Sequence, residues 1–381
     1  MTQDFARCFL PLAMGMVFLG AAQVAPAGEL LVFISAFAKG DEGAIHAYQL
    51  QTATGELKLV QRTTDIEHPF FMALSPNRKY LYSIHAPGQF GGKDNEQIAA
   101  YEITSADGKL KLLNRQSAMG TAACYLEVDA TGRSVMVANY SSGSVAALPV
   151  QEGGSLGAAA TFIPHQAASA AAGKKTVSHA HCIVVSPDNR FAIAADLGLD
   201  QVISYQLDSA TAKLSPAKPP FVATPLGNGP RHLTFHPQGK YVYVINELKN
   251  SVTLYNYEAA AGVLTELQTI STLPPDFKGQ SYCADLKITP NGKFLYGTNR
   301  GHDSIAAYRL ADDGRLTLLG IEPSLGSGPQ NLVITPNGEL LLCANMPGNN
   351  VVVFRINQET GALQLVGKPI SIPSPSCIRI R

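Results

Sequence analysis

Short runs of apolar and β-branched residues follow one another along most of the chain, and each run is bounded by turn residues. The pattern is clearest in the segment Gly229 to Tyr257. There the stretch Arg231 to Phe235 ends at His236 to Gly239 (HPQG), where Pro presets one turn angle and Gly tolerates a positive φ. Tyr241 to Ile245 and Val252 to Tyr257 are rich in β-branched and aromatic residues. The pattern predicts a meander of three strands.

This hairpin recurs along the chain at intervals of 46 to 57 residues. Its turn begins at Ser75, Asp129, Ser186, His236, Thr289 and Thr335. The strand that follows each hairpin occurs seven times, starting near Ala44, Gln97, Gly143, Asp200, Asn250, Asp303 and Asn349. A Gly-x-Leu step usually comes next and starts a fourth strand. Four short antiparallel strands in a unit of about 50 residues are typical of a β-propeller blade.

The hairpin occurs six times but the strand that follows it occurs seven times, and the two ends of the chain together supply the missing first and second strands of the seventh blade. The chain opens with a strand of the second type, Leu30 to Ser35, and closes with Pro375 to Ile380, which matches the first-type strand Pro329 to Ile334. We therefore predict an all-β, seven-bladed propeller of four-stranded antiparallel blades, with the last blade closed by the N- and C-terminal strands together. That closure removes a free strand edge.

The repeat also predicts which side chains meet at the channel, because the first strand of each blade lines it. The equivalent positions on the first strands form a ring around the channel, and we call them the ring positions. They are Phe70, Cys124, His181, Arg231, Ala284, Gln330 and Ser376. The equivalent ends of the second strands, near the same rim, are Ala86, Tyr140, Leu197, Glu247, Arg300 and Met346. The register therefore brings His181, Arg231, Glu247 and Arg300 to one mouth of the channel, from three successive blades.

These four residues form a candidate catalytic cluster. Arg binds carboxylate or phosphate groups in a bidentate manner, and His acts as a base near neutral pH. The alternative is that Glu247 and either Arg form an ion pair with a structural role only. His68 and His179 lie two residues before ring positions, on the same face by strand alternation, and with Gln330 they are candidate substrate-binding residues.

Other residues of these strands receive weaker assignments. His232 is predicted to face away from the ring and His236 lies in a turn, so both are interpreted as structural. Cys124 lies on the ring and is a weak candidate nucleophile. No ring of carboxylates indicates a metal site, so no metal and no cofactor are expected, and a cluster of His68, His179 and His181 is the one reservation.

Composition sets limits on partners. The chain has 381 residues, 46% of them apolar, which is enough for a large core. Lys plus Arg and Asp plus Glu both number 29, so no net field favours nucleic acid. The six cysteines are widely spaced, without a CxxC pair, and are interpreted as small buried hydrophobes, although one disulfide stays open.

The N-terminus predicts export. Arg7 precedes an apolar run from Phe9 to Val24 and the small-residue pattern Ala25-Pro26-Ala27, which favours a signal peptide over residues 1–27. An uncleaved membrane anchor is the alternative. Residues 28–381 then form a single propeller domain, periplasmic or secreted. Two inserts, Ala86 to Glu96 and Gln166 to Ser178, are interpreted as solvated loops, with a substrate lid as the alternative.

Several longer motifs carry a family resemblance. The segments SHAHCIVVSPDNRF, GPRHLTFHPQGKYVYVINELKNSV and LPPDFKGQSYCADLKITPNGKFLYGTNRGHDSIAAY resemble the seven-bladed propeller lactonases, which include bacterial 6-phosphogluconolactonase and the fungal carboxymuconate lactonizing enzyme. The resemblance covers the chain from about Gly28 to Arg381. The family's proposed site has one His, two Arg and one Glu, which implies His181, Arg231, Arg300 and Glu247 here.

The resemblance implies hydrolysis of a sugar-derived lactone, phosphorylated or not, to the hydroxy acid. His181 would activate water, the two arginines would bind the oxyanion and an anionic group, and Glu247 would orient an Arg or relay a proton. Two alternatives stay open: a muconate-type lactonizing cycloisomerase, and an exported propeller that binds a ligand or protein without catalysis. The expected partner is a small lactone or sugar acid, and the chain is expected to be a monomer without a membrane partner after cleavage.

Overall fold

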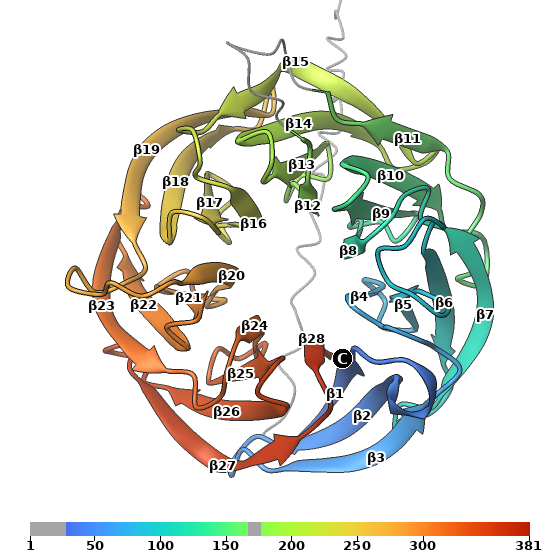
Figure 1. Ribbon diagram of the computed structural model, residues 1–381, viewed down its shortest axis with the longest axis horizontal. Coiled ribbons are helices and arrows are strands. Elements are labelled where there is room, and N and C mark those ends of the chain that lie inside the picture. Colours follow the sequence, from blue (N-terminus) through green and yellow to red (C-terminus); the bar gives the residue numbers. More distant parts are fainter. Residues whose placement is uncertain (1–27, 167–176) are drawn as a thin grey trace, which may run out of the picture.

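The described parts of the chain form a ring of seven four-stranded sheets. The computed structural model describes residues 28–166 and 177–381, and in Figure 1 the sheets surround a central axis with one strand of each sheet lying nearest to it. The predicted all-β propeller is confirmed. Within the described ranges the helical structure is one 3-10 turn, η1 (Gly40–Glu42), and no helix there has the length and apolar content needed to cross a membrane.

Each sheet has an inner, a second, a third and an outer strand. The inner strands are β4 (Met72–Leu74), β8 (Ala123–Val128), β12 (Ala180–Val185), β16 (Pro230–Phe235), β20 (Tyr282–Ile288), β24 (Pro329–Ile334) and β28 (Pro375–Ile380). The second strands are β1 (Glu29–Ala36), β5 (Tyr80–His85), β9 (Ser134–Asn139), β13 (Phe191–Asp196), β17 (Tyr241–Asn246), β21 (Phe294–Arg300) and β25 (Leu340–Asn345).

The remaining strands complete the blades toward the outside. The third strands are β2 (Ala44–Gln51), β6 (Gln97–Ile103), β10 (Ser144–Pro149), β14 (Gln201–Asp208), β18 (Ser251–Glu258), β22 (Ser304–Leu310) and β26 (Asn350–Ile356). The outer strands are β3 (Leu57–Thr63), β7 (Leu110–Ser117), β11 (Thr161–Pro164), β15 (Lys213–Ala223), β19 (Val263–Ser271), β23 (Leu316–Pro323) and β27 (Leu363–Ser371).

The predicted closure of the ring by both ends of the chain is confirmed. The terminal sheet has the order β28-β1-β2-β3, so the C-terminal strand is the inner strand of a blade whose other strands are N-terminal. Ile378 pairs with Ile34, and the hydroxyl of Ser376 lies 2.9 Å from that of Ser35. The predicted signal peptide, residues 1–27, and residues 167–176 of the second insert lie outside the described ranges.

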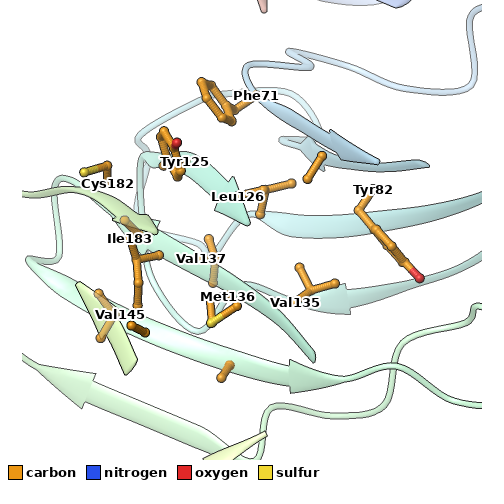
Figure 2. Packing of buried hydrophobic residues seen from close by; sticks show 14 of the residues in the cluster. Phe71, Tyr82, Tyr125, Leu126, Val135, Met136, Val137, Val145, Cys182 and Ile183 are labelled. Atoms are coloured by element: carbon orange, nitrogen blue, oxygen red, sulfur yellow. The ribbon is translucent and has the colours of Figure 1, made fainter. Parts of the chain in front are cut away.

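The core lies between neighbouring sheets. Figure 2 shows Tyr82 of β5, Val137 of β9 and Ile183 of β12 among the side chains of one buried cluster that joins successive blades. The five cysteines in the described ranges are all buried and form no disulfide with one another. Their interpretation as small buried hydrophobes is confirmed for these five.

The inner strands deviate from regular alternation where they line the channel. The register shifts by one residue at Cys124, His181, Arg231 and Gln330, and again by one in β20, where Ala284 and Asp285 fall between the paired residues Cys283 and Leu286. Such β-bulges turn a side chain away from its regular direction. The ring residues are therefore additional residues in their strands, and the residue after each of them can also point to the axis.

This geometry corrects one prediction. His232 does not face away from the ring: it lies against the Arg231 guanidinium and against the ring of His181, whose centroid is 5.3 Å away. The expectation assumed strict alternation after Arg231, and the bulge removes that alternation.

Candidate active site

The start of each inner strand is tied to the end of its second strand. In the blade of β16 the carbonyl of Gly229 accepts the amide of Glu247 at 2.7 Å, and the equivalent bond joins His179 and Leu197 at 2.9 Å. Gly229 has φ +62°, and a Cβ there would lie 2.6 Å from the Leu248 Cγ. The glycine therefore lets the chain pass under Leu248 and places Glu247 beside the next residue but one, Arg231.

Glu247 is held between the two arginines. Its Oε2 lies 2.8 Å from the Arg231 Nε, and its Oε1 lies 2.8 Å from an Arg300 Nη2. The N–H of the Arg231 Nε has no aligned acceptor among the described residues, so this contact is an ion pair rather than a directed hydrogen bond. The predicted cluster of Arg231, Glu247 and Arg300 is thus brought together across two adjacent blades.

Arg231 lies deep in the channel wall, with 1% of its surface exposed. Its Nη1 donates to the carbonyl of Ala284 and approaches the His232 Nε2 at 3.2 Å. Burial, followed by the charge of Arg300, lowers the pKa of Arg231, although a guanidinium stays protonated at any working pH.

Arg300 is the accessible arginine of the pair, because 27% of its side chain is exposed. Its Nη2 donates to the Cys283 carbonyl at 3.1 Å and its Nε to the Tyr282 carbonyl at 3.3 Å. Its Nη1 lies 3.5 Å from the Gln330 Oε1, so the predicted substrate-binding residue Gln330 reaches the cluster through Arg300.

His181 is buried beside the same carboxylate. Its Nε2 lies 4.0 Å from the Glu247 Oε2, which is beyond hydrogen-bond distance. Burial, followed by the positive charge of Arg231, holds the pKa of His181 well below its ordinary value. The imidazole is therefore neutral at neutral pH, the form that can accept a proton.

The other ring nitrogen of His181 faces Cys124. The Cys124 Sγ lies 3.7 Å from the His181 Nδ1 and 3.4 Å from the His181 carbonyl oxygen. Burial raises the pKa of the Cys124 thiol, so the reactive thiolate form is disfavoured. Cys124 contacts the candidate base, and its environment does not favour a nucleophile.

The predicted substrate-binding histidines differ in their surroundings. The ring of His179 stacks on Tyr140 at a centroid distance of 4.4 Å, and Tyr140 meets His181 edge-on at 5.3 Å. His179 therefore reaches the cluster through Tyr140. The Nδ1 of His68 lies 2.9 Å from the Ala86 carbonyl oxygen. His68 packs against Phe37, with no described contact to the four clustered residues.

The structure adds residues that the sequence interpretation missed. Tyr140 follows the second strand β9 at the position equivalent to Glu247 and Arg300, and that equivalence is the signal in the sequence. Asp285 follows the ring position Ala284, as His232 follows Arg231, and its Oδ1 lies 2.9 Å from the His232 Nδ1. Among residues 28–166 and 177–381, no group of three or more His, Cys, Asp or Glu side chains is arranged to hold a metal ion.

The fold and these residues define a class of protein: a seven-bladed β-propeller with a charged cluster at one mouth of its channel. The family described as "Lactonase, 7-bladed beta-propeller" matches residues 31–380. The chain belongs to this lactonase family.

Individual relatives are similar over nearly their whole length. The 6-phosphogluconolactonase of Bacillus subtilis is 32% identical, with 91% of this chain and 97% of that protein covered. The 6-phosphogluconolactonase of Formosa agariphila is 34% identical, with 92% and 99% covered. The structure of the periplasmic gluconolactonase of Pseudomonas aeruginosa superposes with a TM-score of 0.85 at 29% identity, over 93% of this chain and 99% of that one.

Proposed function

We propose that the protein is a lactonase that hydrolyses a sugar-derived lactone to the open hydroxy acid, with His181, Arg231, Glu247 and Arg300 as its catalytic residues. The observation that carries the proposal is the shared carboxylate: Glu247 contacts both guanidiniums at 2.8 Å and lies 4.0 Å from a neutral His181. Membership of the lactonase family supports the same reaction.

In the proposed mechanism a water molecule attacks the carbonyl carbon of the lactone while the His181 Nε2 takes one of its protons. The carbonyl oxygen becomes an oxyanion, which the guanidiniums stabilise. The bond from this carbon to the ring oxygen then breaks, and the ring oxygen receives the proton from His181. Glu247 takes no proton in this scheme, because its role is to orient the two arginines.

The substrate we propose is the unphosphorylated lactone of a sugar acid. A prediction and a comparison support this choice: the signal peptide predicted over residues 1–27, and the likeness to a periplasmic gluconolactonase. An exported enzyme would meet little phosphorylated sugar acid, because such compounds are made and kept inside cells. Periplasmic or secreted localisation is part of the same proposal.

The test compares glucono-1,5-lactone with its 6-phosphate and with a muconate, using the purified protein and its His181→Gln variant. We expect the unphosphorylated lactone to have the highest kcat/KM. The variant should lose about 10² to 10⁴-fold in kcat, because general-base catalysis contributes that much. Turnover of the phosphorylated lactone alone would contradict the proposed substrate but not the reaction.

The matched control is His236→Gln, since His236 lies in the turn between β16 and β17 at the other end of the blade. Its kcat should stay within about twofold of the unmodified protein, as is usual for a residue outside the reacting groups. Equal rates for the unmodified protein and His181→Gln would remove His181 from the mechanism. Product analysis with the muconate separates hydrolysis from cycloisomerisation.

A further inference from the structure

We propose that Asp285 and His232 form a buried pair that positions Arg231 for catalysis. This inference rests on the lactonase function proposed above and adds two positioning residues to it. Both residues lie one position after the ring, on adjacent inner strands β16 and β20, directly below the layer that holds His181 and Arg231.

Asp285 is a carboxylate that can only accept hydrogen bonds. It is 1% exposed, and its oxygens receive the Lys287 Nζ at 2.8 and 2.9 Å, the Asn331 Nδ2 at 2.7 Å and the Leu332 amide at 3.0 Å. Burial by itself would raise its pKa, but the Lys287 ammonium and the hydrogen bond from His232 outweigh it and hold the pKa of Asp285 well below its ordinary value. Asp285 therefore stays ionised.

The charge of Asp285 fixes the tautomer of His232. The His232 Nδ1 lies 2.9 Å from the Asp285 Oδ1, and since an ionised carboxylate has no proton to give, Nδ1 must carry the hydrogen. The lone pair is then on Nε2, which lies 3.2 Å from the Arg231 Nη1. Burial and the neighbouring Arg231 charge lower the pKa of His232 to about 3, so the ring stays neutral.

The consequence for Arg231 is a guanidinium with one orientation. Its Nη1 donates to the Ala284 carbonyl on one side and to the His232 Nε2 on the other, while its Nε faces Glu247. Among the described residues Nη1 makes hydrogen bonds and Nε makes the ion pair with Glu247, whereas Nη2 makes no hydrogen bond and is the donor available to an oxyanion. A planar group held at two of its three nitrogens presents the third in a fixed direction.

The imidazole of His232 also packs against His181, the proposed base. Its ring centroid lies 5.3 Å from that of His181 and 5.1 Å from that of Tyr125, both at steep interplanar angles of 70° and 77°. His232 thus contacts two of the proposed catalytic residues, Arg231 and His181. A purely structural role would require packing and the bond to Asp285, but not an acceptor aimed at Arg231.

Two substitutions separate the hydrogen bond to Asp285 from the acceptor that faces Arg231. In His232→Asn the amide nitrogen reaches the place of Nδ1 and can still donate to Asp285, whereas the acceptor for Arg231 is lost. In His232→Gln the amide oxygen reaches the place of Nε2 and can still accept from Arg231. We expect the Asn variant to unfold at a urea midpoint close to that of the unmodified protein and to lose about 10- to 100-fold in kcat, with a smaller change in KM.

The Gln variant should recover several-fold of the lost kcat relative to Asn, because it restores the acceptor. Unmodified kcat and KM in the Asn variant would overturn the proposal, and so would equal kcat values in the two variants. The KM and kcat of the folded protein are compared at one pH, so a difference in stability alone does not imitate this result.

A measurement on the unmodified protein covers the case in which the variants do not fold. With ¹⁵N-labelled histidine, NMR should show His232, assigned through its contact with Tyr125, as the neutral form with the proton on Nδ1 between about pH 5 and pH 9. A proton on Nε2, or titration within this range, would overturn the proposal. This result does not depend on turnover, so a protein that opens no lactone would disprove the function while the pair is still tested.

Discussion

The two ends of the central channel carry similar charges but arrange them differently. At the proposed site, Arg231 and Arg300 both contact Glu247 at 2.8 Å. At the other end, three residues after the channel-lining positions Cys124, Ala284 and Ser376, are Glu127, Lys287 and Arg379, and Glu127 and Arg379 line a pocket of about 550 Å³. There Lys287 is paired with the buried Asp285, and the Arg379 guanidinium lies 4.5 Å from the Phe71 ring centroid.

Glu127 shows what the difference means. Burial, opposed by the charges of Arg379 and Lys287, raises its pKa to about 7, so this carboxyl is only partly ionised at neutral pH. Glu247, in contrast, has two guanidiniums in direct contact. A channel end becomes a candidate site when its cations converge on a shared point, and the presence of charged residues alone is not sufficient.

The largest expected effect comes from removing the strand that reaches both ends of the channel. β28 carries Ser376 near the site and Arg379 near the other end, and it closes the ring against β1. A chain lacking residues 375–381 should show no cooperative thermal unfolding by calorimetry, because the terminal sheet loses its inner strand and leaves the edge of β1 exposed.

The matched control for this truncation is removal of residues 1–27, since the first strand of the seven described sheets, β1, begins at Glu29. That shorter chain should melt like the full-length protein. A melting temperature within a few degrees of the unmodified value for the chain without residues 375–381 would show that the closure is dispensable.

The next prediction compares the two carboxylates. Glu247→Gln keeps the size of the side chain but removes the charge that orients two arginines, so kcat/KM for the lactone should fall about 10² to 10³-fold. Glu127→Gln at the other end is the matched variant and should stay within about twofold. Steady-state kinetics on folded protein, checked by circular dichroism, decides between them. Comparable losses in both variants would mean that the ends are not functionally distinct.

The smallest expected effect is a pH dependence of stability that comes from Glu127. A carboxyl whose native pKa is raised to about 7 from 4.5 stabilises the native state fully below about pH 4.5, and this contribution is lost as the pH rises through about 7. The free energy of unfolding of the unmodified protein should therefore fall, relative to Glu127→Gln, by about 1 to 3 kcal/mol between pH 5 and pH 8.

Urea unfolding of both proteins at several pH values measures this difference. Because the lost proton-binding group is the sole change, the two curves of free energy against pH should converge at low pH and separate at high pH. Curves that remain parallel would show that the carboxyl of Glu127 titrates normally.

The sequence predicted the fold and the four clustered residues for one reason, which is the repeat. Equivalent positions in a repeated unit lie at equivalent heights, so Arg231 and Glu247 could be placed together by counting alone. The same count placed Tyr140 at this mouth of the channel, but its contacts with His179 and His181 are evident only from the structure.

His232 could not be placed correctly by counting. Alternation in a regular strand separates neighbouring side chains onto opposite faces, and the register shift at Arg231 cancels that rule. No residue type in the segment Gly229 to His232 (GPRH) predicts a β-bulge by itself. The contact of His232 with Arg231, and through it the link to Asp285, therefore depends on backbone geometry that only the structure shows.

The register of the terminal sheet has a consequence for orientation. Val32 pairs with Ile380, and the Arg381 Nε donates to the Arg78 carbonyl in the turn after β4, so the described chain begins and ends on the face with the Pro-x-Gly turns. The proposed catalytic residues lie at the opposite end of the inner strands. In Figure 1 the sheets of β12 and β16 lie across the ring from β28, and that of β20 is next to that of β16. A molecule tethered to a surface by either end of this domain would therefore turn the mouth with the proposed site outward, toward the solution that would supply its substrate.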